Sequence, residues 1–221
     1  MRAKTTREPL SRERALAAAV ALVDAEGLPA LTMRRLAADL GVEAMSLYYH
    51  LPGKEGLLDG LAETVIGEIT VAARAVDETH DWRASLRRRF LAAREVMLRH
   101  PWAPGLLSSR PAIPLALFAY YDEIVATLIA GGCSPRIAHR ALHAFGSLAL
   151  GFAQEIFTPA TTDVGAAEED LTSMAETLPH LTAMMAAEVH DATDPALGWC
   201  DTQTEFEFTI DLLLDGIARA R

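Results

Sequence analysis

Hydrophobic residues recur every three or four positions along almost the whole chain, which is the period of a helix with one buried face. Sustained alternation of hydrophobic and polar residues, typical of strands, is absent from the sequence. Capping residues and glycines divide the first part into four helices: one from Ser11 to Gly27, one from Thr32 to Gly41, one over residues 43–50 and one from Lys54 onward. We therefore expect an all-α fold.

The rest of the chain predicts longer helices separated by short breaks. Four prolines between residues 101 and 114 divide that stretch into short pieces, and the acidic residues 158–170 predict an exposed loop. The longer helices are expected over residues 82–99, 115–129, 134–157, 171–189 and 202–220. The expected total is nine or ten helices.

Composition narrows the class of protein. The chain has 221 residues, 51% hydrophobic and 23% charged, which excludes a disordered chain. Its two cysteines, Cys133 and Cys200, are too few for a disulfide framework or a cysteine zinc cluster. No apolar run approaches the ~20 residues that span a membrane, and residues 1–16 lack the apolar segment of a signal peptide. We expect a cytoplasmic protein that has no membrane partner.

Charge is distributed unevenly along the chain. Residues 1–55 contain eight Lys and Arg against seven Asp and Glu, whereas residues 56–221 contain twelve against twenty-three. This asymmetry favours two functions on one chain. A flexible, soluble N-terminal tail accounts for the same charges, and Arg2, Lys4 and Arg7 fit either a DNA-binding arm or a plain leader.

The segment TMRRLAADLGVEAMSLYYHL, residues 32–51, predicts two short helices joined by a tight turn at Gly41 and Val42. A small residue, Ala37, precedes that glycine by one helical turn, where a bulky side chain would hold the second helix away. Leu36, Leu40 and Leu47 stand where two steeply crossed helices need apolar contacts. This is the spacing of a helix-turn-helix, whose second helix enters the DNA major groove. Ordinary helix pairs also show this spacing.

Residues 11–61 resemble the TetR family of bacterial transcriptional repressors. The resemblance lies in SRERALAAAVALVDAEGLPALTMRRLAADLGV and SLYYHLPGKEGLLDGL, with Leu47-Tyr48-x-His50 and Lys54 among the matching positions. It implies a DNA-binding domain over residues 1–60 and an effector-binding and dimerisation domain over residues 61–221. It also implies a function in DNA binding for nine residues: Thr32, Arg34, Ala44, Met45, Ser46, Tyr48, Tyr49, His50 and Lys54.

These nine residues fall into three groups. Thr32 and Arg34 begin the first helix of the motif, where phosphates are bound; Ala44, Met45 and Ser46 would face base edges. Tyr48, Tyr49, His50 and Lys54 would meet phosphates. Taken singly, Arg34 also fits a solvated face, Tyr48 a packed aromatic and His50 a helix end.

Residues 96–157 resemble the tetracycline-repressor branch, with Ser109-Arg110-Pro111 and Leu150-Gly151-Phe152 as landmarks. The histidines that branch uses around its metal chelate are replaced by Thr70 and Leu106, so a magnesium–tetracycline effector is not expected. Aromatic and polar groups in this region favour a pocket for an amphipathic molecule, although plain core packing explains each one singly. The predicted ligand residues are Trp102, Leu106, Phe118, Tyr121, His143, Ser147 and Phe152.

No catalytic motif is found, and His139 with His143, spaced i, i+4, lacks a third metal ligand. We therefore predict no enzyme activity, no metal and no cofactor. The resemblance implies a homodimeric repressor that binds a palindromic operator in double-stranded DNA and releases it when a small lipophilic or amphipathic molecule binds. The alternative is a DNA-binding regulator whose C-terminal domain only dimerises or binds a protein.

Overall fold

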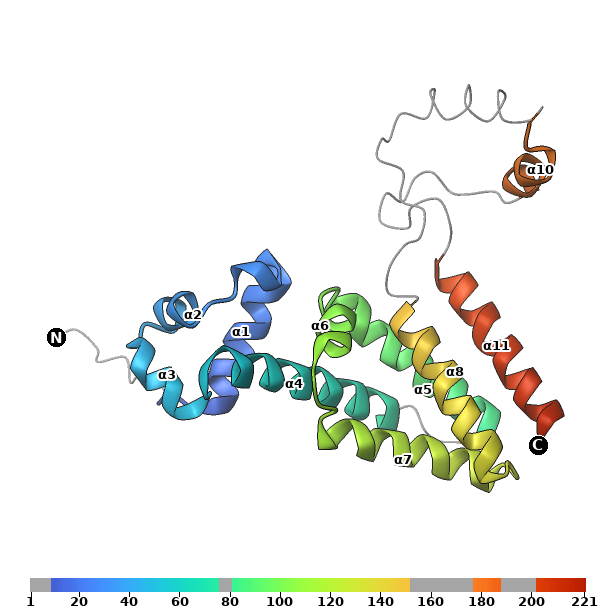
Figure 1. Cartoon of the computed structure of the whole chain (residues 1–221), viewed down its shortest axis with the longest axis horizontal. Coiled ribbons are helices and arrows are strands. Elements are labelled where there is room, and N and C mark those ends of the chain that lie inside the picture. Colours follow the sequence, from blue (N-terminus) through green and yellow to red (C-terminus); the bar gives the residue numbers. More distant parts are fainter. Residues whose placement is uncertain (1–8, 76–80, 152–176, 188–201) are drawn as a thin grey trace. The chain divides into compact units, whose positions relative to one another are not determined.

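The computed structural model describes residues 9–75, 81–151, 177–187 and 202–221 (Figure 1). These residues form ten α-helices and one 3-10 turn, and no strand occurs among them. The chain divides into two compact units, residues 1–153 with 211–221 and residues 154–210. The helices are α1 (Arg12–Glu26), α2 (Met33–Leu40), α3 (Ala44–His50), α4 (Gly53–Ala75), α5 (Trp82–Arg99), α6 (Ala103–Ser109), α7 (Leu115–Ala130), α8 (Pro135–Gly151), α10 (Pro179–Ala187) and α11 (Thr202–Ala220).

Local capping explains where the first helices begin. The hydroxyl of Ser11 accepts a hydrogen bond from the backbone N–H of Arg14 at 3.1 Å, and that of Thr32 accepts one from Arg35 at 3.1 Å. Each bond satisfies one of the amides that a helix start leaves without a partner. Both predicted caps are confirmed, and so is the all-α fold class.

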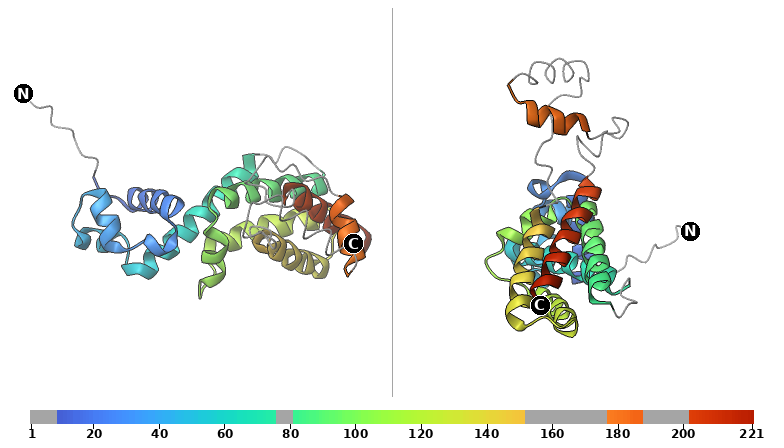
Figure 2. Two further views of the ribbon diagram at one scale, coloured as in Figure 1. Left: turned by 90° about the horizontal axis from the view of Figure 1, so that it is seen from above. Right: turned by 90° about the vertical axis from the view of Figure 1, so that its right-hand side faces the viewer.

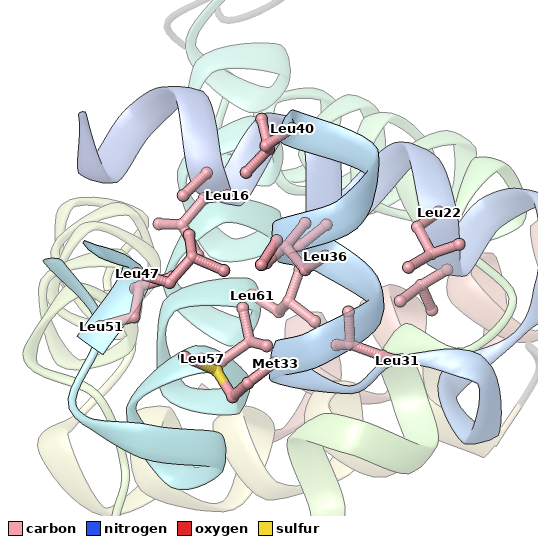
Figure 3. Close-up of a cluster of buried hydrophobic side chains, with 14 of the residues drawn as sticks. Leu16, Leu22, Leu31, Met33, Leu36, Leu40, Leu47, Leu51, Leu57 and Leu61 are labelled. Atoms are coloured by element: carbon pink, nitrogen blue, oxygen red, sulfur yellow. The ribbon is translucent and has the colours of Figure 1, made fainter. Parts of the chain in front are cut away.

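Helices α1 to α3 and the first half of α4 share one apolar core, and we call residues 11–61 the head. Leucines from all four helices meet there, including Leu16, Leu36, Leu47 and Leu61 (Figure 3). Leu36, Leu47 and Leu61 have no exposed surface, and Leu16 is 5% exposed. Figure 3 shows their side chains converging between the helices. This packing fixes the crossing of α2 and α3.

Helix α4 continues from the head without a break (Figure 2). Its first half buries Leu57 and Leu61 in the head core, and its second half buries Val65, Ile66 and Ile69. We call this second half, with α5, α7 and α8, the body. The domain border predicted near residue 60 falls inside this continuous helix.

Ion pairs hold the end of α4 to α5 and α7. Glu123 on α7 accepts hydrogen bonds from Arg74 on α4 and from Arg89 on α5, the latter at 2.7 Å. The bond from Arg74, assisted by Arg89, holds the pKa of Glu123 below its ordinary value. Arg89 is almost fully buried, so this pair fixes how the three helices pack.

Several helix predictions are matched within one or two residues, namely those of 82–99, 115–129 and 202–220. Two are only partly covered: the helix predicted over 134–157 is seen from Pro135 to Gly151, and that over 171–189 from Pro179 to Ala187. The predicted loop over 158–170 lies outside the described residues. In the described part of the chain, no helix combines the length and hydropathy needed to cross a bilayer.

Candidate nucleic-acid interface

The turn between α2 and α3 is a tight helix stop. Gly41 adopts the left-handed conformation with φ +62°, which glycine adopts without steric cost. Its N–H donates to the carbonyl of Ala38 at 3.0 Å, and the N–H of Val42 donates to that of Ala37 at 3.0 Å. These are the two bonds of a Schellman motif, which satisfies the last carbonyls of α2. Helix α3 therefore starts three residues later, at a fixed angle.

Helix α3 presents nearly all of its surface outward. Leu47 is its one buried residue, whereas Met45 is 77% exposed, Tyr48 46% and Tyr49 89%. Ser46 is also exposed, and Ala44 is half-buried at the start of the helix. Large apolar side chains are rarely left outside a fold in one cluster. Leu47, with a smaller contribution from Ala44, holds the helix on the core, and the exposed side chains of Met45, Ser46, Tyr48 and Tyr49 face outward.

Two cations flank this helix. Arg34 in the first turn of α2 and Lys54 in the first turn of α4 are exposed, and within the described residues neither makes an ion pair. The neighbouring Arg35 is different, because it pairs with Glu26 at 2.7 Å and with Asp39 at 3.1 Å. As far as the described residues go, Arg34 and Lys54 therefore offer unpaired positive charge, whereas Arg35 is paired within the head.

The remaining predicted contacts lie near these cations in sequence. Thr32 is exposed at the start of α2, and His50 at the end of α3 is half-buried with its ring edge-on to that of Tyr49, 5.2 Å between centroids. Lys54 follows Gly53, where the free amides of α4 begin. A cation at a helix start opposes the helix dipole, and a phosphate bound between them removes that conflict.

Helix α6 connects the head with the body. Leu106 is buried in the head core, while Leu107 both packs against that core and lines a cavity in the body. After the helix, Arg110 has an almost fully buried side chain that forms ion pairs with Glu55 at 2.6 Å and Asp59 at 2.9 Å. Both carboxylates belong to the first turns of α4. These ion pairs connect the end of α6 directly to the start of α4.

A second link lies between α5 and α6. The indole N–H of Trp102 donates to the carboxylate of Asp24 on α1 at 2.6 Å. The buried ring of His100 bridges the same carboxylate, Nδ1 to Oδ1 at 2.8 Å, and Glu68 on α4, Nε2 to Oε2 at 3.2 Å. This network joins the end of α1 to α4 and to the α5–α6 connection.

The cavity of about 190 Å³ lies between α4, α5, α7 and α8. Its walls are mostly aliphatic and aromatic; the lining residues are Ile66, Ile69, Phe90, Ala93, Met97, Leu107, Ile113, Leu117, Tyr120, Tyr121, Ile124, Leu142, Phe145, Gly146 and Ala149. The rings of Phe90 and Phe145 stack within it, 4.4 Å between centroids and 19° between planes. Such a site can enclose a small apolar molecule.

The structure brings few of the predicted ligand residues to this cavity. Tyr121 lines it, but Trp102 and Leu106 pack against the head core instead. Phe118, His143 and Ser147 are exposed and do not line it, and Phe152 lies outside the described residues. The physical reason is that aromatic and apolar content does not distinguish side chains around a void from side chains in a filled core.

Sequence reasoning missed two kinds of functional residue. Tyr120, beside Tyr121, lines the cavity and is 6% exposed, and the i, i+4 spacing of Tyr120 with Ile124 on one face of α7 was the available signal. Arg110 belongs to the Ser109-Arg110-Pro111 landmark, and its ion pairs with α4 were not predicted. Its partners lie 51 and 55 residues earlier in the chain, so local patterns carry no sign of the contact.

The histidine pair on α8 stays on the outside of the fold. The rings of His139 and His143 meet edge to face, 4.7 Å between centroids, and both side chains are exposed. Among the described residues, no group of three or more His, Cys, Asp or Glu side chains is placed to hold a metal ion. The pair has no third ligand there.

Two family models match this chain. "Bacterial regulatory proteins, tetR family" matches residues 15–61, and "Tetracyclin repressor-like, C-terminal domain" matches residues 76–221. The first match covers the helix-turn-helix, and the second covers α5 and every helix after it.

Named relatives agree with these models. An HTH-type transcriptional regulator of Saccharopolyspora erythraea is 35% identical over 127 residues, 58% of this chain and 52% of that protein, so this chain spans about half of that relative. The class A tetracycline repressor protein from transposon 1721 of Escherichia coli is 30% identical over 206 residues, 92% of this chain and 88% of that protein.

A solved structure shares the fold. The Streptomyces coelicolor TetR family protein ActR, in complex with actinorhodin, is 22% identical and superimposes with a TM-score of 0.74 over 96% of this chain and 97% of ActR. At that identity the likeness concerns the fold alone. The two family models together span the helix-turn-helix and the body. This chain therefore belongs to the TetR family of bacterial regulatory proteins.

Proposed function

We propose that this protein is a homodimeric, cytoplasmic transcriptional repressor that binds a palindromic DNA operator and releases it when a small lipophilic molecule occupies the cavity. Residues 1–60 would form the DNA-binding domain and residues 61–221 the effector-binding and dimerisation domain. The observation that carries the proposal is the outward face of α3, whose one buried residue is Leu47 and which is flanked by Arg34 and Lys54, two cations without an ion pair among the described residues.

The side chains of α3 fit a particular kind of base readout. Met45 and Ala44 offer apolar contact to thymine methyl groups, and the hydroxyl of Ser46 donates or accepts a hydrogen bond. Arg34, Lys54, Thr32 and the phenol groups of Tyr48 and Tyr49 supply phosphate contacts, which set register and affinity. His50 supplies a further phosphate contact beside Tyr49.

Dimerisation follows from the small reach of one recognition helix. Helix α3 has seven residues and reads only a few base pairs, whereas a two-fold dimer reads two half-sites about 34–36 Å apart. Exposed apolar residues on α11, Phe208 at 60% and Leu212 at 53%, supply a face that a second copy would cover. A dimer also doubles the number of phosphate contacts.

Helix α6 supports a response to a ligand. A molecule in the cavity pushes on Leu107, and Arg110 passes any movement of α6 to Glu55 and Asp59 at the start of α4. Since α4 carries Lys54 and packs on α3, the spacing of two recognition helices in a dimer changes with it. The actinorhodin complex of ActR supports a small-molecule effector for this fold. The effector must bind the two states with different affinity.

The alternative is a regulator whose C-terminal domain only dimerises or binds a protein. One observation favours this alternative: the cavity of about 190 Å³ is smaller than the roughly 300–1,000 Å³ of pockets that bind drug-sized ligands. Under this alternative no small molecule would change operator affinity.

Selection from a random duplex library with the purified chain tests the proposal, followed by affinity measurements at two salt concentrations. Enrichment of a two-fold palindrome is expected, with affinity that falls steeply as salt rises. Arg34→Ala and Lys54→Ala should each weaken binding and reduce the salt slope by about 2 per dimer, because two phosphate contacts are lost.

Arg35→Ala is the matched control, since Arg35 is equally close to α3 in sequence but paired with Glu26 and Asp39. We expect it to leave the salt slope unchanged. An unenriched pool, or an equal effect of the three substitutions, would contradict the proposed interface.

A further inference from the structure

The walls of the cavity are of one chemical kind. In the described part of the chain, all but two of its lining residues have hydrocarbon, thioether or no side chains, and the exceptions are the phenols Tyr120 and Tyr121. No lining side chain among them is charged at neutral pH, and none is an amide or an imidazole. A buried cation, Arg89, lies 5.8 Å from the centre of the Tyr120 ring but does not line the cavity, and it is paired with Glu123. A charged ligand would therefore lose its hydration there without gaining a free counter-charge. The walls therefore favour an uncharged ligand.

Tyr120 supplies a polar group of this cavity that has no hydrogen-bond partner among the described residues. The residue is 6% exposed, and its hydroxyl oxygen is buried. Burial raises the pKa of Tyr120, so the phenol stays protonated and remains a donor at neutral pH. Buried polar atoms in native proteins nearly always have a partner, and a bound ligand is one way to supply it.

The shape of the walls adds a second constraint. The stacked rings of Phe90 and Phe145 both line the cavity, and stacked aromatic pairs accept further flat rings at their edges and faces. A volume of about 190 Å³ is below the range of drug-sized pockets. The ligand that fits best has one or two fused rings.

We propose that the effector is an uncharged, mainly apolar molecule with one or two rings and a single hydrogen-bond acceptor, and that this acceptor receives the hydrogen bond of the Tyr120 hydroxyl. A ring ketone is the simplest member of this class. The inference rests on the proposed effector function of the cavity, and it makes Tyr120 a specificity-determining residue.

Three probes with one ring system test the ligand class by calorimetry on the full chain without DNA: naphthalene, 2-acetonaphthone and 2-naphthoate. The methyl ketone is expected to bind tightest, with naphthalene about fivefold to tenfold weaker for lack of one hydrogen bond. The carboxylate is expected to bind at least about tenfold more weakly than the ketone, because its charge is desolvated without a partner. Equal affinity of ketone and carboxylate, or of ketone and naphthalene, would overturn the assignment.

Two matched tyrosine variants test the residue. Tyr120→Phe removes the donor and keeps the ring, so it should reduce ketone affinity to that of naphthalene and leave naphthalene affinity unchanged. Tyr121→Phe makes the same change at the next position of the same cavity, and ketone affinity should be unaffected. If Tyr121→Phe has the larger effect, Tyr120 is not the donor.

A cavity-filling variant locates the binding. Ala93 lines the cavity and is buried on α5, so Ala93→Leu places three more carbon atoms in the void. It should weaken the binding of every probe that the unmodified chain binds. Unchanged binding in this variant, with its thermal midpoint retained, would mean that the probes bind elsewhere and would overturn the proposal.

Failure of this inference differs from failure of the proposed function. If the chain selects a palindrome but binds none of the probes, the ligand class is wrong and the DNA-binding function stands. If the probes bind as expected but no DNA is enriched, the cavity assignment stands and the operator-binding function fails.

Discussion

The core of the head is filled by apolar side chains, whereas the interior of the body contains a cavity. The head core is made of leucine, alanine, valine and methionine side chains with almost no exposed surface. The body encloses a cavity of about 190 Å³ beside the buried polar groups of Tyr120 and Arg89. Leaving a volume of that size empty lowers the free energy of unfolding by on the order of several kcal/mol, because the lining side chains lose packing contacts.

The difference corresponds to where each region meets its partner. The head would meet DNA on its outside, so a filled core is an advantage because it holds α3 at a fixed angle. The body would meet a ligand on its inside, so full packing would abolish the site. Helix α6 lies at the junction, with Leu106 in the filled core and Leu107 at the cavity. The head thus has a filled core that fixes α3, and the body has an unfilled volume that a ligand can occupy.

The largest expected effect on stability comes from truncating the one buried residue that α3 contributes to the head core. Leu47→Ala removes the one buried side chain of that helix and should lower the free energy of unfolding by about 2–5 kcal/mol, because a cavity replaces it. DNA affinity should fall as well, since α3 loses its anchor. Urea unfolding followed by circular dichroism at a fixed protein concentration measures the first effect.

The matched control for that change lies two residues away on the same helix. Tyr49 is 89% exposed, so Tyr49→Ala should change the free energy of unfolding by no more than about 0.5 kcal/mol while it weakens operator binding. If Tyr49→Ala destabilises the fold as much as Leu47→Ala, the outward face of α3 is structural and its proposed contact with DNA is wrong.

The turn between α2 and α3 gives the next largest effect. Gly41→Ala forces a side chain into the left-handed conformation at φ +62° and should cost about 1–2 kcal/mol of unfolding free energy. Gly105→Ala is the opposite case, because Gly105 lies in α6 with ordinary helical backbone and an added Cβ meets nothing within 4 Å. It should stabilise the chain by about 0.5–1 kcal/mol. Thermal and urea unfolding of both variants compare the two glycines.

Most of the head was predictable from the sequence, because its determinants are local. The caps at Ser11 and Thr32, the left-handed glycine at position 41 and the inward leucine at position 47 each act within a few residues. The cavity was not predictable, since a void depends on how four helices pack and leaves no local pattern. The i, i+4 spacing of Arg35 and Asp39 was a local sign that Arg35 is paired, whereas its second partner, Glu26, lies on another helix and could not be predicted from local spacing.

The smallest expected effect concerns the polar group in the body and appears only in alkaline solution. Burial raises the pKa of Tyr120 above its ordinary value of 10, so above about pH 10 the unfolded chain releases this proton while the folded chain keeps it. The unfolded state then binds fewer protons, and stability falls as pH rises, by at most about 1.4 kcal/mol per pH unit for this group. Tyr120→Phe should remove that part of the decline between pH 9.5 and 11, whereas a control substitution at an exposed phenol, Tyr49→Phe, should not. Urea midpoints across this range, with the slopes of the two variants subtracted from that of the unmodified chain, measure the difference. Identical slopes in all three proteins would mean that the phenol of Tyr120 is solvated in solution, and the cavity would then lack the buried hydrogen-bond donor that its lining otherwise supplies.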